Sequence, residues 1–231
     1  MENESDKNNS KYNVEYLGEI QTQNLKNLKF YKVIILGIYG VGKTTIINKL
    51  MNKNFDKEYA PTISVDVKNF KVKVNDKNIH IQIWDCCGND EFALNTPNLF
   101  KNTSLAILVY AINDKEKSFN NLKSWYNILN EHSYDNIIFL IGNKNDLEEE
   151  REVKIEDVEE FKNSYPNINI FFETSALNGQ NIDKLLENIA ISIYEKDKKE
   201  ENILNNVLEG RITLNKEDLT KKGKKKKRNF C

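Results

Sequence analysis

The sequence predicts an α/β fold, a doubly wound and mostly parallel six-stranded sheet with one antiparallel hairpin strand and helices on both faces. Continuous apolar runs of strand length alternate along the chain with segments whose apolar residues recur at helical spacing. Continuous runs are typical of strands that helices cover on both faces, whereas an alternating pair of segments indicates a half-exposed hairpin. The 231 residues suffice for one such domain. Ligands of these sheets bind at the carboxyl ends of the strands.

The first predicted strand, residues 30–36, leads into a glycine-rich loop and a helix start. Backbone N–H groups of such a loop point inward at a phosphate chain, and glycine is needed where a Cβ would collide. Lys43 offers an ammonium to the outer phosphates, Thr44 offers a hydroxyl to Mg²⁺, and the helix adds its positive dipole end. The alternative is a glycine turn that only reverses the chain, which the order of strand, loop, lysine, hydroxyl and helix disfavours. The loop glycines are Gly37, Gly40 and Gly42.

A hairpin and three further strands complete the predicted sheet. Residues 55–63 contain a proline and are too irregular for a helix, which indicates a functional loop. Residues 65–74 and 79–84 alternate apolar and polar side chains around a polar turn, as hairpin strands do. Beyond them we expect strands at 105–110, 137–141 and 170–172, and helical spacing at 119–129 and 182–193.

Polar groups suited to a nucleotide follow three of the predicted strands. Asp85 can hold Mg²⁺ through water, and Gly88 leaves a backbone N–H free for a γ-phosphate. Asp146 can accept hydrogen bonds from the N1–H and amino group of guanine, two donors that adenine does not present on that edge. Asn143 would pin this loop, and the stem of the lysine after it would cover one face of the base. Residues 173–177 offer backbone N–H groups to the guanine oxygen.

Together these motifs resemble the small GTPases of the Ras superfamily, and specifically the Rab family. The resemblance covers roughly residues 30–196, so we expect a small G domain with a P-loop over residues 29–196. The matching motifs, in family order, are the glycine loop and residues 59–63, 84–88, 143–146 and 175–177. The Rab character rests on Ile-Ser-Val-Asp-Val, which is similar to I-G-V-D-F, at residues 63–67, and on residues 81–84 and 118–122.

The resemblance implies a GTP- and GDP-dependent switch that hydrolyses GTP and recruits effectors in vesicle-mediated transport. It implies Mg²⁺ ligands at Thr44, Thr62 and Asp85, and catalytic roles for Lys43, Gly88 and Asn89. Loss of the γ-phosphate would release the loops around Thr62 and Gly88, which act as switches. The implied nucleotide-binding residues, among which Phe55 flanks the guanine, are Gly40, Val41, Gly42, Lys43, Thr44, Thr45, Phe55, Thr62, Gly88, Asn143, Lys144, Asp146, Ser175, Ala176 and Leu177.

Two residues depart from the family pattern where the attacking water is positioned. Asn89 stands where the family usually has glutamine, and Tyr39 stands where it usually has glycine or serine. We hypothesise slow intrinsic hydrolysis, below about 10⁻⁴ s⁻¹, with Tyr39 obstructing an arginine from an activating protein. The alternatives are normal cycling through compensating geometry, or a hydrolysis-poor scaffold that stays bound to GTP. An ATP-dependent P-loop enzyme is a third interpretation, which Asp146 disfavours.

The two ends of the chain differ in composition from the predicted domain. Residues 1–28 are polar with scattered apolar side chains, and we expect a flexible extension. Residues 197–231 are expected to form a hypervariable tail, with seven of the chain's 34 basic residues between positions 221 and 228. This basic run and one lipid chain on Cys231 would anchor the protein to an anionic membrane. The lone cysteine fits neither the paired cysteines of Rabs nor C-a-a-X, and a solvated tail or a nuclear-localisation signal is the alternative.

Composition and the resemblance also indicate location and partners. Three cysteines without metal-ligand spacing, no signal peptide and no apolar run of about 20 residues favour a cytoplasmic protein. By resemblance it would lie peripherally on the cytosolic face of endomembranes. The implied partners are guanine nucleotide, an exchange factor, an activating protein, effectors, and a Rab escort protein or dissociation inhibitor. No nucleic acid is expected.

Overall fold

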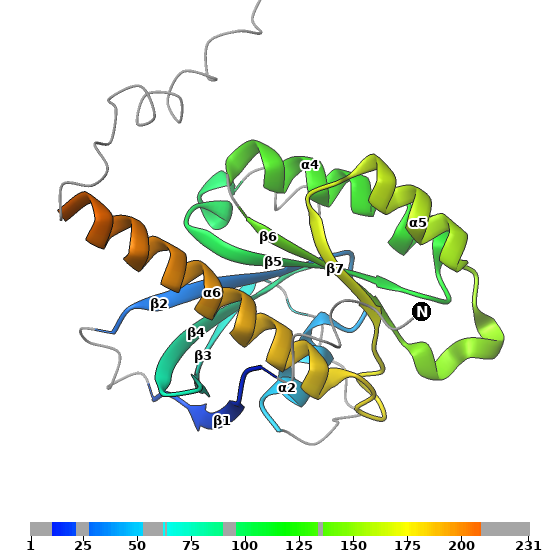
Figure 1. Ribbon diagram of the computed structural model, residues 1–231. Helices are drawn as coiled ribbons and strands as arrows, with labels where there is room; N and C mark the ends of the chain where they lie inside the picture. Colours follow the sequence, from blue (N-terminus) through cyan, green and yellow to red (C-terminus); the bar gives the residue numbers. More distant parts are fainter. Residues whose placement is uncertain are drawn as a thin grey trace, which may run out of the picture. The chain divides into compact units, whose positions relative to one another are not determined.

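The computed structural model describes residues 11–21, 28–52, 62, 64–89, 96–133 and 136–208. The chain divides into two compact units, Met1–Ile193 and Tyr194–Cys231, and the first holds the whole sheet. Figure 1 shows this sheet with its helices. Within the described residues, no helix is both long enough and apolar enough to cross a membrane.

A seven-stranded sheet forms the centre of the first unit, in the order β1-β3-β4-β2-β5-β6-β7. Strands β4, β2, β5, β6 and β7 are parallel to one another, and β3 is antiparallel to β4. The predicted mostly parallel α/β sheet with its hairpin is therefore confirmed. The strands are β1 (Val14–Glu19), β2 (Phe30–Leu36), β3 (Val65–Val74), β4 (Lys77–Cys86), β5 (Thr103–Ala111), β6 (Ile137–Asn143) and β7 (Ile168–Glu173).

The prediction of six strands was wrong by one, because β1 adds an antiparallel edge to the hairpin. It pairs Val14 with Val74 and Glu19 with Phe70, with a bulge between Tyr16 and Gly18. This strand lies within residues 1–28, which were expected to be flexible. Its side chains alternate between half-buried and exposed, and the Tyr16 ring lies 5.9 Å from the ring of Phe70. A strand that buries only one face carries a weak apolar signal, which explains the error.

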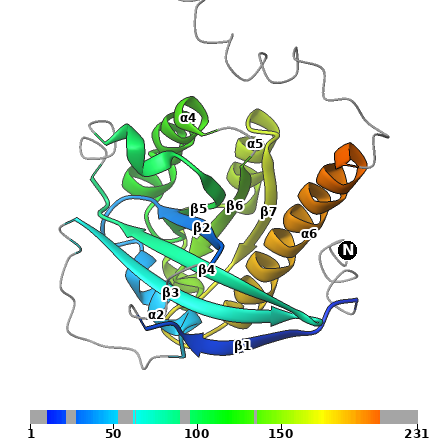
Figure 2. The same cartoon turned by 90° about the vertical axis from the view of Figure 1, so that its left-hand side faces the viewer.

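Helices cover both faces of the sheet. Figures 1 and 2 show α4 and α5 on one face, and α2 with the first part of α6 on the other. Three short helical turns, η2, η3 and η4, occur in the connections. The helical elements are α2 (Lys43–Leu50), η2 (Pro97–Phe100), η3 (Lys115–Phe119), α4 (Leu122–His132), η4 (Asn145–Glu150), α5 (Ile155–Ser164) and α6 (Ile182–Leu208).

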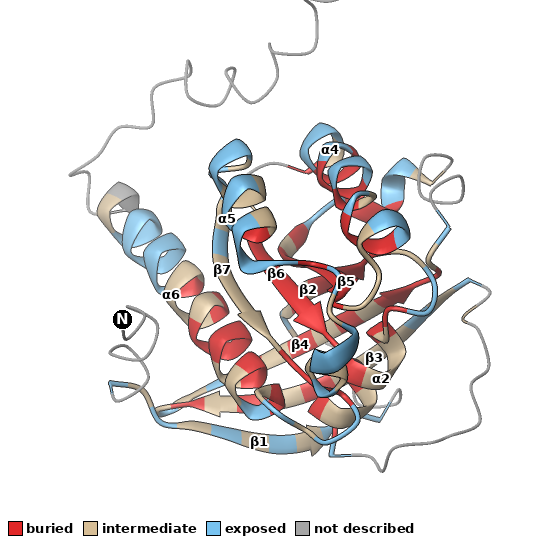
Figure 3. Cartoon of the chain, turned by 90° about the vertical axis from the view of Figure 1, so that its right-hand side faces the viewer, coloured by how far each residue is buried: buried red, intermediate tan, exposed pale blue. Residues whose placement is uncertain are grey.

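The core lies between the central strands and these helices, as the buried colouring in Figure 3 shows. Eight of the nine residues of β5 are buried, as expected for a strand covered on both faces. The spacing of the apolar residues of α4 turns Leu122, Trp125 and Leu129 into the core. Rigid packing of the strands fixes their carboxyl ends, from which the loops of the candidate site extend.

Candidate functional site

The glycine loop lies between β2 and α2, and two of its glycines lie very close to neighbouring residues of the domain. Gly37 has φ +142°, and a Cβ there would lie 2.2 Å from the carbonyl oxygen of Val109. Gly42 has φ +95°, and a Cβ there would lie 2.3 Å from Nδ2 of Asn143. Both positions therefore require glycine, because side chains rarely adopt these angles and no space is left for a Cβ.

Lys43 begins α2 and folds its side chain back over the loop. Its side chain is buried, and Nζ donates to the carbonyl oxygens of Gly37 at 2.7 Å and Ile38 at 2.8 Å. A buried ammonium requires negative or carbonyl partners. The loop therefore holds one positive charge beside the N-terminus of α2, where the helix dipole also favours an anion.

Three oxygen-bearing side chains from different segments meet next to this loop. The Thr44 hydroxyl donates to Oδ2 of Asp85 at 2.6 Å and lies 3.0 Å from the Thr62 hydroxyl. The Thr62 hydroxyl also donates to Oδ2 of Asp85, at 3.4 Å. The other carboxylate oxygen of Asp85 is buried and has no hydrogen-bond partner among the described residues.

These residues fit a magnesium ion. Burial raises the pKa of Asp85, while the Thr44 hydrogen bond and the charge of Lys43 oppose this rise. A buried carboxylate oxygen without a partner is costly unless a cation or donor satisfies it. Hydroxyl and carboxylate oxygens are the hard ligands that Mg²⁺ prefers. The structure thus brings together the three residues that were predicted as metal ligands.

Gly88 packs directly against the glycine loop. The backbone N–H of Tyr39 donates to the Gly88 carbonyl at 3.3 Å, and a Cβ at Gly88 would lie only 1.9 Å from that nitrogen. Asn89, next in the chain, is exposed. Tyr39 is 71% exposed and also lines the cavity beside the glycine loop, so it stands at the mouth of the site. A small cavity here is lined by Tyr39, Gly40, Gly42, Lys43, Thr44, Thr45, Thr62, Cys86 and Gly88.

The two adjacent cysteines of this region are both buried. Burial raises the pKa of the Cys86 thiol to about 12, so the thiol stays protonated and is a poor nucleophile.

A second cavity, of about 350 Å³, opens beside the same glycine loop. Asp146 is exposed and accepts a hydrogen bond from the Ser175 hydroxyl at 2.5 Å. Lys144 adopts a left-handed backbone, φ 68°, at the turn from β6 into η4. The lining residues are Gly40, Gly42, Thr45, Asn143, Lys144, Asp146, Ala176 and Leu177.

Asn143 joins the three loops that surround this cavity. Its Nδ2 donates to the Val41 carbonyl at 2.8 Å. Its Oδ1 accepts from the Thr174 hydroxyl at 3.1 Å and from the Ala176 backbone N–H at 3.2 Å. Since its side chain is buried, these bonds are shielded from water and tie the glycine loop to the loops after β6 and β7.

Two predicted residues, Phe55 and Cys231, lie outside the described part of the chain. Sequence reasoning missed a different pair, Arg151 and Glu173, whose side chains form an ion pair at 2.7 Å between the end of η4 and the end of β7. A signal for it was present, because Arg151 is the only arginine between residues 30 and 196 of this lysine-rich chain.

Comparison with known protein families gives one match that spans most of the chain. The model of the Ras family matches residues 32–195. The chain belongs to the Ras family.

As a Ras-family small GTPase, the protein is a molecular switch that binds guanine nucleotide with Mg²⁺ and hydrolyses GTP. Family membership also implies partners of the general kinds expected, namely exchange factors, activating proteins and effectors. The match begins in β2 and ends in α6, so β1 lies outside the part that the family shares.

Proposed function

We propose that the protein is a Rab-like GTPase with a long-lived GTP-bound state, acting in vesicle-mediated transport. The observation that carries the proposal is the arrangement of Tyr39, Gly88 and Asn89. The Tyr39 backbone is hydrogen bonded to Gly88, and its ring is 71% exposed at the mouth of the phosphate cavity. An arginine that an activating protein would insert must pass this ring.

The hydrolytic step depends on how an attacking water is oriented. A glutamine amide at position 89 would reach the water, whereas the amide of Asn89 is shorter by one methylene. Orientation of the nucleophile and stabilisation of charge supply most of the rate in phosphoryl transfer. Both departures therefore lower the hydrolysis rate and leave nucleotide binding intact.

The binding residues divide between the two cavities. Lys43 and the backbone N–H groups of the glycine loop would hold the phosphates, with Gly88 contributing its N–H to the γ-phosphate. Thr44, Thr62 and Asp85 would hold Mg²⁺, which would supply positive charge to the phosphates of the nucleotide. Asp146 would accept hydrogen bonds from guanine, with Lys144 and Phe55 covering the base and residues 175–177 donating to its oxygen.

The Rab assignment rests on the motifs around residues 63–67, 81–84 and 118–122. The basic residues between 221 and 228 favour attachment to an anionic membrane, and geranylgeranylation of Cys231 would complete the anchor. On this proposal the protein lies peripherally on the cytosolic face of endomembranes.

Bound nucleotide in the purified protein tests the long-lived GTP state. We expect the protein to carry mainly GTP, and the variant Asn89→Gln with Tyr39→Ser to carry mainly GDP. GDP in both would contradict the proposal. GTP in both would contradict the roles proposed for Asn89 and Tyr39 in slowing hydrolysis.

A further inference from the structure

A single arginine bonds to side chains of both η4 and the end of β7, the elements on either side of the second cavity's loops. Arg151 directly follows η4, and its side chain is 17% exposed. Its guanidinium donates to both carboxylate oxygens of Glu173, each at 2.7 Å. Glu173 ends β7 and is 15% exposed. Such a two-pronged, largely buried pair fixes the relative position of two segments more tightly than an exposed ion pair does.

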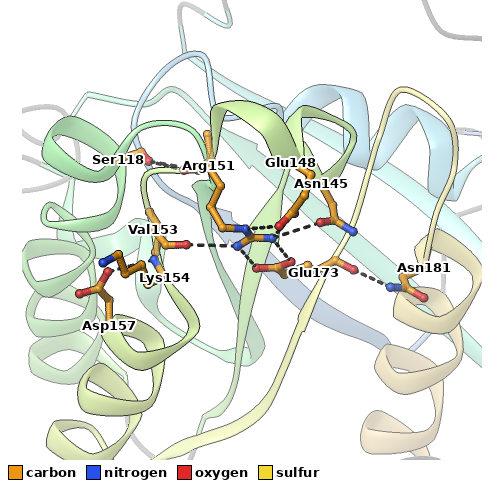
Figure 4. Close-up of polar contacts among 10 residues, drawn as sticks. Ser118, Asn145, Glu148, Arg151, Val153, Lys154, Asp157, Glu173 and Asn181 are labelled. Carbon is orange, nitrogen blue, oxygen red and sulfur yellow. Dashed lines mark hydrogen bonds and ion pairs between the residues drawn. The ribbon is translucent and has the colours of Figure 1, made fainter.

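The same guanidinium also binds the other loop. Its Nε donates to Glu148 at 2.8 Å and a terminal nitrogen donates to the second Glu148 oxygen at 2.5 Å. The other terminal nitrogen reaches the Val153 carbonyl at 3.1 Å. The hydrogen bonds from Arg151 lower the pKa of the Glu148 carboxyl. Figure 4 shows Arg151 between Glu148 on one side and Glu173 on the other.

Asn145 fills the remaining space in this cluster. With its amide oxygen toward Arg151 it accepts a hydrogen bond at 3.3 Å. With the amide turned, which satisfies more atoms, it donates to Glu173 at 3.1 Å and accepts from Gln180 at 3.1 Å. Its backbone N–H donates to the Thr174 carbonyl at 3.0 Å. In either orientation, Asn145 links η4 to the segment that follows β7.

The positions of these partners connect the cluster to the cavity. Asn145 and Glu148 flank Asp146 within η4, and Glu173 immediately precedes the segment that carries Ser175 and Ala176. Ser175 is the hydrogen-bond donor to Asp146. Arg151 and Glu173 do not themselves line the cavity among the described residues. The guanidinium thus bonds to one residue two positions after Asp146 and to one two positions before Ser175, without lining the cavity itself.

We propose that Arg151 is a positioning residue for base selection, holding Asp146 and the segment 174–176 at the separation that guanine requires. This inference rests on the proposed placement of the base beside Asp146. A lysine would supply the charge but not the planar fork that reaches Glu173 and Glu148 together. The use of arginine here, in a chain that otherwise uses lysine from residue 30 to 196, supports a need for that fork.

The dissociation rates of two nucleotides show whether Arg151 positions the base-binding residues or only supports the fold. Inosine diphosphate, IDP, lacks the exocyclic amino group of guanine and so loses one hydrogen bond to Asp146. We expect IDP to leave the wild-type protein about tenfold faster than GDP, since a tenfold change equals about 1.4 kcal/mol, near the lower end of what a hydrogen bond to a charged group contributes. In Arg151→Lys and Arg151→Ala we expect GDP to leave at least several-fold faster. The ratio of the IDP dissociation rate to the GDP dissociation rate should fall toward one.

A control variant removes an ion pair of the same length elsewhere. Lys115 pairs with Asp157 at 2.7 Å, and Lys115→Ala should leave both rates and their ratio unchanged. Arg151→Lys keeps the charge and volume of the site, so it remains informative if Arg151→Ala unfolds. Double exchange, Arg151→Glu with Glu173→Arg, should restore part of the ratio by re-forming the pair.

The outcomes distinguish this inference from the proposed function. A wild-type ratio near one would show that Asp146 does not read the base, which overturns the proposed placement and with it the role of Arg151. A wild-type ratio near ten that persists in Arg151→Lys would overturn the inference alone. Equal acceleration of both nucleotides in that variant would do the same, because it indicates support of the fold without base selection.

Discussion

The phosphate end and the base end of the site are held together in different ways. At the phosphate end, Thr44, Thr62 and Asp85 bond to one another through oxygens that would turn to Mg²⁺. At the base end, Asn143 and Arg151 bond to groups of the protein itself. In the proposed function, the first set would exchange its bonds on ligand binding, whereas the second would keep them.

This difference indicates how one domain can be both a switch and a selective receptor. Loops that exchange protein bonds for ligand bonds can take two arrangements, which is what a switch needs. A base is selected well only if its partners are held in place before it binds, because unmatched polar groups then carry the full penalty. The comparison predicts that changes at the two ends affect affinity and base selectivity separately.

The largest effect is expected from removing the charge at the phosphate end. Lys43→Ala should weaken GDP binding by about 10³-fold, since two charge-assisted hydrogen bonds contribute about 2 kcal/mol each. The ratio of the affinities for GDP and IDP should stay at its wild-type value, because the base contacts are intact. Competition binding with both nucleotides measures this, and a changed ratio would break the separation of the two ends.

A change at the base end should reverse selectivity. Asp146→Asn replaces an acceptor with a group that can donate, so guanine loses its partner and xanthine gains one. We expect GDP to bind about 100-fold more weakly and xanthosine diphosphate to bind more tightly. Titration of both nucleotides checks the change. Equal weakening of both would mean that Asp146 supports the loop only and does not read the base.

Removal of Mg²⁺ tests the proposed metal ligands Thr44, Thr62 and Asp85. Chelation with excess EDTA should speed release of GDP by about tenfold, the equivalent of about 1.4 kcal/mol, and release of IDP by the same factor. The effect should be smaller in Thr44→Val, which has lost one predicted ligand. If Thr44→Val responds to chelation as the wild type does, Thr44 is not a metal ligand.

The smallest effect on nucleotide binding is expected far from either end, at the additional edge strand. Tyr16→Ala removes the ring that packs beside Phe70 and should lower the free energy of unfolding by about 1–2 kcal/mol. Nucleotide dissociation rates should be unchanged, since β1 pairs with the half of β3 that is remote from Thr62. Urea unfolding measures the first quantity, and a changed GDP dissociation rate would link β1 to the site.

The sequence predicted the elements whose signal is strong and local. Continuous apolar runs identified the central strands, and the glycine, lysine and threonine spacing identified the phosphate loop. The edge strand β1 was missed because only one of its faces is covered, and α5 was not predicted because Val158 is its only buried residue. Arg151 stood out in the sequence as the only arginine between residues 30 and 196, but its partners were not predicted, since Glu148 and Glu173 are far apart in the chain and meet only through the register of β6 and β7.

Single-turnover hydrolysis of GTP with Mg²⁺ tests the central claim most directly. The wild-type protein should hydrolyse below about 10⁻⁴ s⁻¹, slower than Ras itself. The variant Asn89→Gln with Tyr39→Ser should reach the ordinary rate of a small GTPase, and Lys115→Ala should match the wild type. Equal rates in the wild type and the double variant would contradict the account and make this protein an ordinary timer.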